Sequence, residues 1–183
     1  MRTFIAIDFS QQLKNEISNL QADVRSLASS GRWKFIDNFH LTLKFLDEID
    51  ANMIESISRE LYNISKETSR FKLNISGIGN FPGKGSIRVL WLGLGGETDR
   101  LNVLQNMIDA SLKNLGFAVE KRSYTPHITI AQDVVFSREF SEIEKISKAK
   151  QFSEINVESI FLFKSEQIGH KRVYTSIGEF RFQ

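Results

Sequence analysis

One four-residue pattern occurs twice in this chain, at His40–Leu43 (HLTL) and at His127–Ile130 (HITI). Both copies read histidine, aliphatic, threonine, aliphatic, and they hold two of the three histidines among 183 residues. In a β-strand, side chains two positions apart point to the same face. Each copy therefore predicts a strand with an imidazole and a hydroxyl on one face and two apolar side chains on the other.

The predicted elements follow the same order around both copies. In each half, a strand and an amphipathic helix precede the motif strand, and a helix and a strand follow it. The first series spans residues 3–79 and the second 87–163, with one further strand at the C-terminus. We therefore expect a single domain over residues 1–183, made of two similar half-chains. A pseudo-twofold relation between them would bring the motif strands to facing positions across one site.

Caps and turn residues predict where several elements begin and end. Ser10 is the expected N-cap of the first helix, and Ser29–Gly31 its expected end. The glycine-rich segment Gly77–Gly85 predicts a loop or a hairpin connection. Short strands are expected at Arg32–Ile36 and Ala118–Arg122.

The composition excludes several classes of protein and of site. Charged residues make up 25% of the chain and the formal net charge is +2, which gives no support for a protein that coats long nucleic acids. The chain has no cysteine, which excludes disulfides, a thiolate nucleophile and cysteine-based zinc sites. No apolar run approaches the roughly 18 residues that a transmembrane helix needs, and Asp8 interrupts the short N-terminal one. We expect a cytoplasmic protein without membrane association.

Two histidines on opposite sides of a reacting centre suit displacement at a phosphodiester. The imidazole pKa lies near neutrality, so one ring can deprotonate the nucleophile while the other protonates the leaving group. The attacking and leaving oxygens lie roughly in line on opposite faces of phosphorus. Thr42 and Thr129 share the faces of His40 and His127 and can donate hydrogen bonds to the non-bridging oxygens. The residues alone do not assign which histidine is the acid.

Segments outside the motifs add a resemblance to a known family. They are Arg2–Asp8 (RTFIAID), Arg32 and Trp33 leading into His40–Leu46, Val89–Gly93 (VLWLG) and Pro126–Ala131 (PHITIA). With them, the chain resembles the 2H phosphoesterase superfamily, which is named for two His-x-Thr-x motifs. Within it, the chain is most similar to the RNA 2′,3′-cyclic phosphodiesterases, also called 2′-5′ RNA ligases. The resemblance spans nearly the whole chain in the family's order.

The resemblance implies a bilobal α+β fold, with two antiparallel sheets and outer helices around a central cleft. It implies metal-independent hydrolysis of an RNA or nucleotide 2′,3′-cyclic phosphate to a 2′-phosphate without a cofactor, and reversible 2′-5′ RNA ligation as a further family activity. His127 would accept the proton of water and His40 would donate one to the departing 3′-oxygen, while Thr42 and Thr129 hold the phosphate. We expect a monomer whose partners are RNA ends or nucleotides.

Cationic residues near the motifs are further candidates for the cleft. Strict alternation would place Lys44 on the face of His40 and Thr42, which makes Lys44 the preferred additional phosphate-binding residue. Arg32 and Arg122 precede the two motif strands and are weaker candidates, because arginines are common on protein surfaces.

The chain departs from the family just after the second motif, where Gln132 occupies a position that often holds arginine. Alternation would place Gln132 on the face opposite His127, away from the site. We expect Trp33 and Phe39 to pack in the core rather than to stack on a base, and His170 to lie in an exposed turn.

Other functions stay open from the sequence. A binding module could hold RNA 3′ ends without turnover, but binding alone has no need for two matched proton-transfer groups. A related phosphodiesterase acting on 2′-5′ oligonucleotides or on a small cyclic-phosphate metabolite would use the same motifs. A zinc site would need a third ligand, which does not occur at helical or hairpin spacing from either histidine, so no metal is expected.

Overall fold

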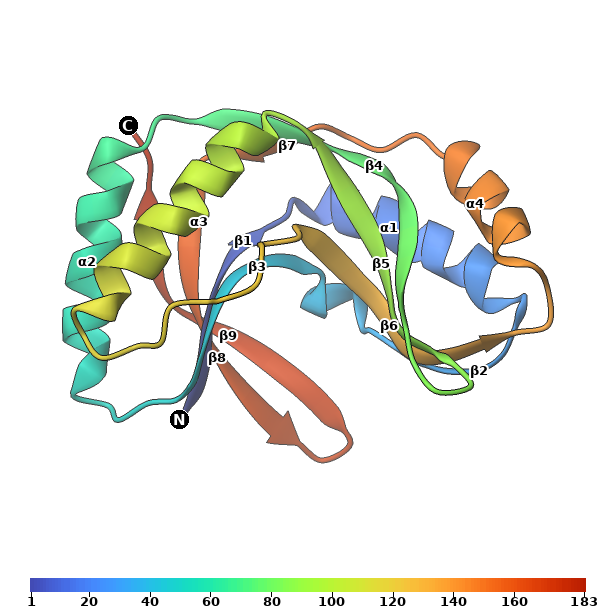
Figure 1. The fold of residues 1–183 in the computed structure, drawn as a ribbon, viewed down its shortest axis with the longest axis horizontal. Helices are drawn as coiled ribbons and strands as arrows, with labels where there is room; N and C mark the ends of the chain where they lie inside the picture. The colour runs from blue at the N-terminus through green and yellow to red at the C-terminus, as the bar shows by residue number, and fades with distance from the viewer.

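In the computed structural model, which describes residues Met1–Gln183, the strands form two separate sheets (Figure 1). The first sheet has the order β3-β1-β8-β9 and consists of β1 (Arg2–Asp8), β3 (His40–Glu48), β8 (Ser159–Ile168) and β9 (Lys171–Arg181). The second has the order β2-β6-β5-β4-β7 and consists of β2 (Ala28–Trp33), β4 (Phe71–Pro82), β5 (Ile87–Gly96), β6 (His127–Phe136) and β7 (Ile155–Val157). All neighbouring strands are antiparallel. One motif strand therefore lies in each sheet.

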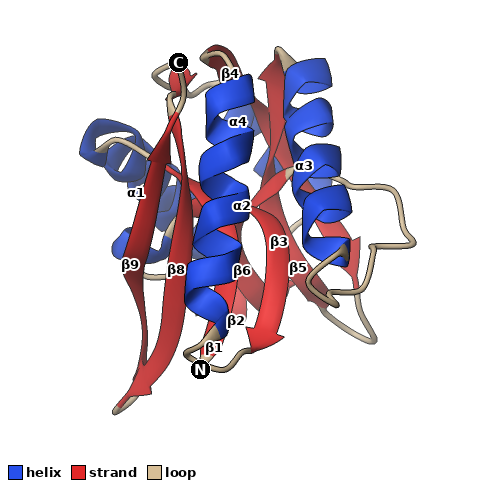
Figure 2. Ribbon diagram, turned by 90° about the vertical axis from the view of Figure 1, so that its left-hand side faces the viewer, coloured by secondary structure: helices blue, strands red, loops and turns tan.

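Four α-helices lie outside the two sheets. They are α1 (Gln11–Arg25), α2 (Met53–Glu67), α3 (Thr98–Lys113) and α4 (Phe140–Lys148), and a 3-10 turn, η1 (Ile36–Asn38), precedes β3. Helices α2 and α3 pack together on the first sheet, while α1 and α4 pack together on the second (Figures 1 and 2). The Ser10 side chain accepts a hydrogen bond from the Leu13 amide, which confirms the expected cap of α1. No helix has the length and apolarity needed to cross a bilayer.

The two sheets correspond to each other strand by strand. The order β3-β1-β8 in the first matches β6-β5-β4 in the second, so each motif strand is the neighbour of the first strand of its half-chain. The expected bilobal α+β fold with two antiparallel sheets is confirmed. Each lobe draws strands and helices from both halves of the chain, because β4 crosses into the second sheet and β8 into the first. This exchange supports our proposal that residues 3–79 and 87–163 are two similar half-chains of one domain.

The apolar side chains of both motifs lie in one core that extends through both lobes. That core holds 35 buried hydrophobic residues. Leu41, Leu43, Ile128 and Ile130 belong to it, and none is more than 3% exposed. Phe39, directly before the first motif, is fully buried, as expected. Each such side chain contributes about 1.5–3 kcal/mol by leaving water, so burial fixes which face of each motif strand turns inward.

A β-bulge follows the first motif and changes the alternation there. Leu43 has no partner on β1, because Thr42 and Lys44 pair with consecutive β1 residues. The extra residue turns Lys44 to the opposite side of the sheet, where its ammonium pairs with Asp109 of α3. The expectation that Lys44 shares the face of His40 and Thr42 is therefore wrong.

A second bulge follows the second motif at the equivalent place. Ile130 has no partner on β5, because Thr129 and Ala131 pair with consecutive β5 residues. This reverses the alternation, so that Gln132 lies on the side of His127 and lines the same cavity. The expectation that Gln132 points away from the site is also wrong.

The segment after α1 differs from the sequence expectation. Helix α1 ends at Arg25, and Ser29–Gly31, expected to end it, lies within β2. The strand expected at Arg32–Ile36 therefore begins and ends earlier in the chain, and η1 follows it. Serine and glycine are weak strand formers, so pairing with β6 rather than local propensity decides this strand.

Gly77–Gly85 lies in a hairpin that joins the antiparallel strands β4 and β5, which confirms the hairpin alternative. Most of the segment is paired, because β4 continues to Pro82 and only residues 83–86 lie outside the two strands. Another segment differs from expectation because of tertiary contacts. Ala118–Arg122 forms no strand. Its backbone is held instead by side chains of β3 and α3, as described below.

We predict that Lys44→Met destabilises the protein by about 3–5 kcal/mol, because it leaves the Asp109 carboxylate buried without its partner. The two side chains are 8% and 10% exposed. The free energy of unfolding, measured by urea titration, should recover most of this loss in the double variant Lys44→Met/Asp109→Leu. Lys121→Met, at an exposed lysine, is the control. Equal stability of both lysine variants would contradict the prediction.

Candidate active site

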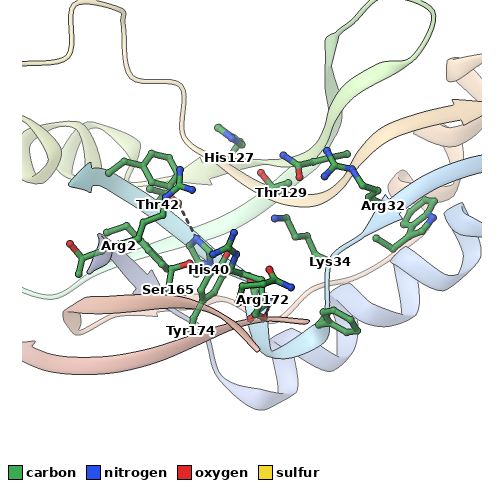
Figure 3. A pocket seen from close by; sticks show the side chains of 18 of the residues that line it. Arg2, Arg32, Lys34, His40, Thr42, His127, Thr129, Ser165, Arg172 and Tyr174 are labelled. Carbon is green, nitrogen blue, oxygen red and sulfur yellow. Dashed lines mark hydrogen bonds between the residues drawn. The ribbon is translucent and has the colours of Figure 1, made fainter. Parts of the chain in front are cut away.

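A cavity of about 510 Å³ is lined by residues of both sheets (Figure 3). The polar residues of both motifs lie in it: His40, Thr42, His127 and Thr129. The structure thus brings together four side chains that the sequence placed in two separate strands. Their aliphatic neighbours in the motifs face the core, as described above.

Both imidazoles are held in the same way. Nδ1 of His40 lies 2.9 Å from the carbonyl oxygen of Asn38, and Nδ1 of His127 lies 2.7 Å from that of Thr125. Each acceptor lies two residues before its histidine. A carbonyl oxygen only accepts, so Nδ1 carries the hydrogen in each neutral ring and Nε2 keeps its lone pair. Nε2 is therefore the atom available for proton transfer in both motifs.

His40 lies in surroundings that favour its neutral form. Burial, together with the positive charge of Lys34, lowers the pKa of His40 from 6.5 to about 4, against the opposing effect of the Asn38 hydrogen bond. The rings of Phe4 and Tyr174 pack against the imidazole, with centroids 4.8 Å and 5.2 Å away. In the free protein at neutral pH, His40 is an uncharged acceptor at Nε2.

His127 packs against two aromatic residues of the β4–β5 hairpin. The ring of Phe81 meets the imidazole edge-on at 5.1 Å, and Trp91 lies 6.3 Å away. Trp91 covers Gly79, where an added Cβ would come within 2.2 Å of the indole, so only glycine fits beneath it. These contacts limit the movement of the His127 ring.

The two arginines expected near the cleft have different positions. Arg32 lines the cavity, and its Nε donates to Asp133 at 2.9 Å, so its charge is largely compensated. Arg122 is exposed, pairs with Glu120 and does not line the cavity. The expectation that Arg122 lines the cleft is therefore wrong.

Three further cations line the cavity that sequence reasoning missed: Arg2, Lys34 and Arg172 (Figure 3). Burial lowers the pKa of Lys34, as do the nearby charges of Arg32 and Arg172. Neither Lys34 nor Arg172 forms a salt bridge with a carboxylate, whereas Arg2 lies 3.8 Å from Asp47. The only feature of the sequence that indicated these additional cations was the spacing of Arg32 and Lys34, which lie two residues apart before the first motif. Uncompensated cations in a cavity favour an anionic ligand.

Other residues complete the cavity wall. Gln132 lines it beside the second motif, and Phe45, 65% exposed, lines it beyond the first. Trp33, expected in the core, is half-buried: it packs against the core and also lines the cavity. His170 lies in the exposed turn between β8 and β9, as expected, and also reaches the cavity. No group of three or more His, Asp or Glu side chains that could hold a metal ion occurs in the chain.

Comparison with known protein families matches residues 7–91 and 93–174 to the family described as LigT like Phosphoesterase. The RNA 2′,3′-cyclic phosphodiesterase of Methanocaldococcus jannaschii is 32% identical over 181 residues, which cover 98% of this chain and 99% of that protein. The Thermotoga maritima protein of the same name is 36% identical over 132 residues, covering 72% of this chain and 70% of its own.

Two crystal structures have the same fold. TT0787 of Thermus thermophilus superposes with a TM-score of 0.82 at 22% identity, covering 100% of this chain and 98% of its own. Escherichia coli LigT in complex with 3′-AMP superposes with a TM-score of 0.80 at 24% identity, covering 99% of this chain and 97% of its own.

We predict that His40 makes stability depend on pH. The pKa of His40 is lower in the folded state, so the unfolded state binds more protons between about pH 4 and 6.5, and stability falls as the pH is lowered through this range. When the pH is lowered from about 7.5 to about 4.5, the free energy of unfolding should fall by about 2 kcal/mol more in the wild type than in His40→Gln. Denaturant titration at each pH measures this difference. His170→Gln should behave like the wild type. Equal losses in all three proteins would contradict the prediction.

Proposed function

The chain belongs to the LigT-like phosphoesterase family, and on this basis we propose that it hydrolyses 2′,3′-cyclic phosphates of RNA ends or nucleotides to 2′-phosphates. The observation that carries the proposal is one cavity with two histidines, each with Nδ1 anchored to a carbonyl, and two threonines. Relatives that match over nearly the full length carry the name RNA 2′,3′-cyclic phosphodiesterase.

The proposed reaction adds water across the bond between phosphorus and the 3′-oxygen. Nε2 of His127 accepts a proton as the water oxygen bonds to phosphorus. Nε2 of His40 gives its proton to the 3′-oxygen as the P–O3′ bond breaks. The phosphate stays on the 2′-oxygen, and the two rings return to their first protonation states through solvent. Ligation would be the same step with the 5′-hydroxyl of a second RNA in place of water. His127 accepts the proton of that hydroxyl, the 5′-oxygen bonds to phosphorus and the P–O3′ bond breaks, which leaves a 2′-5′ phosphodiester and a 3′-hydroxyl.

The assignment of His40 as the donor requires a protonated ring when substrate is bound. Burial and the charge of Lys34 oppose this in the free protein. A cyclic phosphate brings one negative charge into the cavity, which offsets Lys34 and raises the pKa of His40 towards neutrality. In our proposal, substrate binding therefore favours the protonated form of His40 that donates the proton.

The threonines and the missed cations account for phosphate binding. Thr42 Oγ1 lies 3.0 Å from Nε2 of His40, so its hydroxyl lies beside the atom that would donate the proton. Thr129 lines the cavity at the matching position of the second motif. Lys34 and Arg172 supply the positive charge that sequence reasoning had assigned to Lys44. Together they would stabilise the charge that develops on the non-bridging oxygens.

We predict that the purified protein opens a 2′,3′-cyclic nucleotide in excess EDTA and gives only the 2′-phosphate, seen by phosphorus NMR. His40→Ala or His127→Ala should lower kcat/KM by about 10²–10⁴-fold, because each removes one proton-transfer group. His170→Ala, at the third histidine, should change it less than about tenfold. Turnover of 2′-5′ oligonucleotides in the same assay would extend the substrate class. Unchanged turnover in both motif variants would contradict the proposal.

We predict that a cyclic substrate with sulfur in place of the 3′-oxygen separates the two roles. A thiolate leaves without a proton, so the donor is no longer required. His40→Ala should therefore recover most of its lost kcat on the sulfur substrate, whereas His127→Ala should not. The opposite pattern would exchange the two assignments.

A further inference from the structure

The segment that leads from α3 to the second motif has no regular structure of its own. Residues 117–126 form neither helix nor strand, yet they end directly at His127. The two motif strands lie in different sheets, so no ladder of backbone hydrogen bonds joins them. Side-chain contacts to residues 117–126 therefore help to decide where His127 lies relative to the first motif.

One set of contacts holds the start of this segment to the strand of the first motif. Lys44 donates to the carbonyl oxygen of Ala118 at 2.8 Å, and the Asp109 carboxylate accepts from the amide of Glu120 at 3.1 Å. Lys44 and Asp109 also pair with each other. Because both side chains are almost fully buried, this part of the segment is fixed to β3 and α3.

A second contact joins the end of the segment to the first motif itself. The hydroxyl of Tyr124 donates to the carbonyl oxygen of Thr42 at 2.8 Å. Burial raises the pKa of Tyr124, so the hydroxyl stays protonated and remains a donor throughout the working range of pH. The bond runs from β3 of the first sheet to the segment that enters β6 of the second.

The residue after Tyr124 orients the catalytic ring. The carbonyl oxygen of Thr125 accepts the Nδ1 hydrogen of His127, and Pro126 restricts Thr125 to extended conformations. One peptide link thus separates the Tyr124 anchor from the carbonyl that sets the imidazole. The matching acceptor for His40 is the carbonyl of Asn38, which is anchored differently: the side-chain amide of Asn38 donates to the carbonyl oxygen of Arg172 in β9 of the first sheet, at 2.8 Å. The anchor of His127 crosses between the lobes.

We propose that Tyr124 is a positioning residue that fixes the His127 imidazole opposite the first motif. The inference rests on the proposed function, because it assigns the bond a role in proton transfer. The Tyr124 hydroxyl acts through Thr125 and His127 and does not itself touch substrate. Loss of this bond would leave the Thr125 carbonyl, and with it the ring, less well defined.

Tyr124→Phe removes the hydroxyl and little else. The kcat for a 2′,3′-cyclic nucleotide should fall about tenfold to a hundredfold, since small displacements of a catalytic group have effects of this size. KM should change less than about twofold, because the pairing of β3 with β1 still holds Thr42, and Thr129 and the cations that bind the phosphate do not contact Tyr124 through this bond. Tyr62→Phe, at a tyrosine of α2 that is 54% exposed, is the matched control and should keep the wild-type kcat. A wild-type kcat in Tyr124→Phe would overturn the inference.

The same substitution in a His127→Ala background tests whether Tyr124 acts through that ring. Groups that act as a unit are not additive, so the double variant should have the residual rate of His127→Ala alone. If Tyr124 supported only the general fold, Tyr124→Phe would lower kcat by the same factor in the His127→Ala background as in the wild type. Equal losses in both backgrounds would overturn the inference.

Nitrogen-edited NMR of the histidine rings gives a readout that needs no turnover. In Tyr124→Phe, the Nδ1 hydrogen of His127 should exchange with water faster than in the wild type, while that of His40 stays as it was. Unchanged exchange at His127 would overturn the inference even in an active enzyme. An inactive wild type with the expected change at His127 would overturn the proposed function and leave the anchoring role of Tyr124 in place.

Discussion

The burial of alternate aliphatic side chains in both motif strands is the constraint on which the site depends. Leu41 and Leu43 in one sheet, and Ile128 and Ile130 in the other, lie in a single core that extends through both lobes. Because strand geometry puts their neighbours on the opposite face, each histidine and threonine must turn towards the cavity. The same burial that stabilises the two sheets therefore sets the faces from which the proposed chemistry would proceed.

The two matching bulges decide which of the residues that follow each motif face the cavity and which are buried elsewhere. One unpaired residue after each motif reverses the alternation, at Leu43 and at Ile130. Lys44 is thereby removed from the cavity and becomes part of a buried ion pair, whereas Gln132 is brought into it. The replacement of the family's frequent arginine by Gln132 thus falls on the cavity wall. The uncompensated charges of Lys34 and Arg172, from other segments of the chain, lie in the same cavity.

A hydrogen bond between the two lobes lies next to one of the two proposed proton-transfer residues. Each imidazole is oriented by a carbonyl two residues earlier, but only the one at His127 depends on a contact across the lobes, from Tyr124 to Thr42. In each sheet the motif strand pairs with the first strand of its own half-chain, so β3 and β6 occupy corresponding places in the two sheets. The buried environment of His40, with its low pKa, then makes the charge of a bound phosphate part of the acid–base chemistry we propose.

By itself, the sequence determined the elements whose pattern is local. The periodicity of α1, the alternation within each motif and the order of elements in the two halves are all set by residues near one another in the chain. Only the tertiary structure decided the bulges, the pairing of the Ser29–Gly31 segment with β6, the side-chain anchors of residues 117–126 and the cation contributed by β9. These features arise from contacts between distant segments. Strict alternation depends only on residues adjacent in the chain. It therefore predicted the histidines and threonines of the cavity but not the cationic side chains around them.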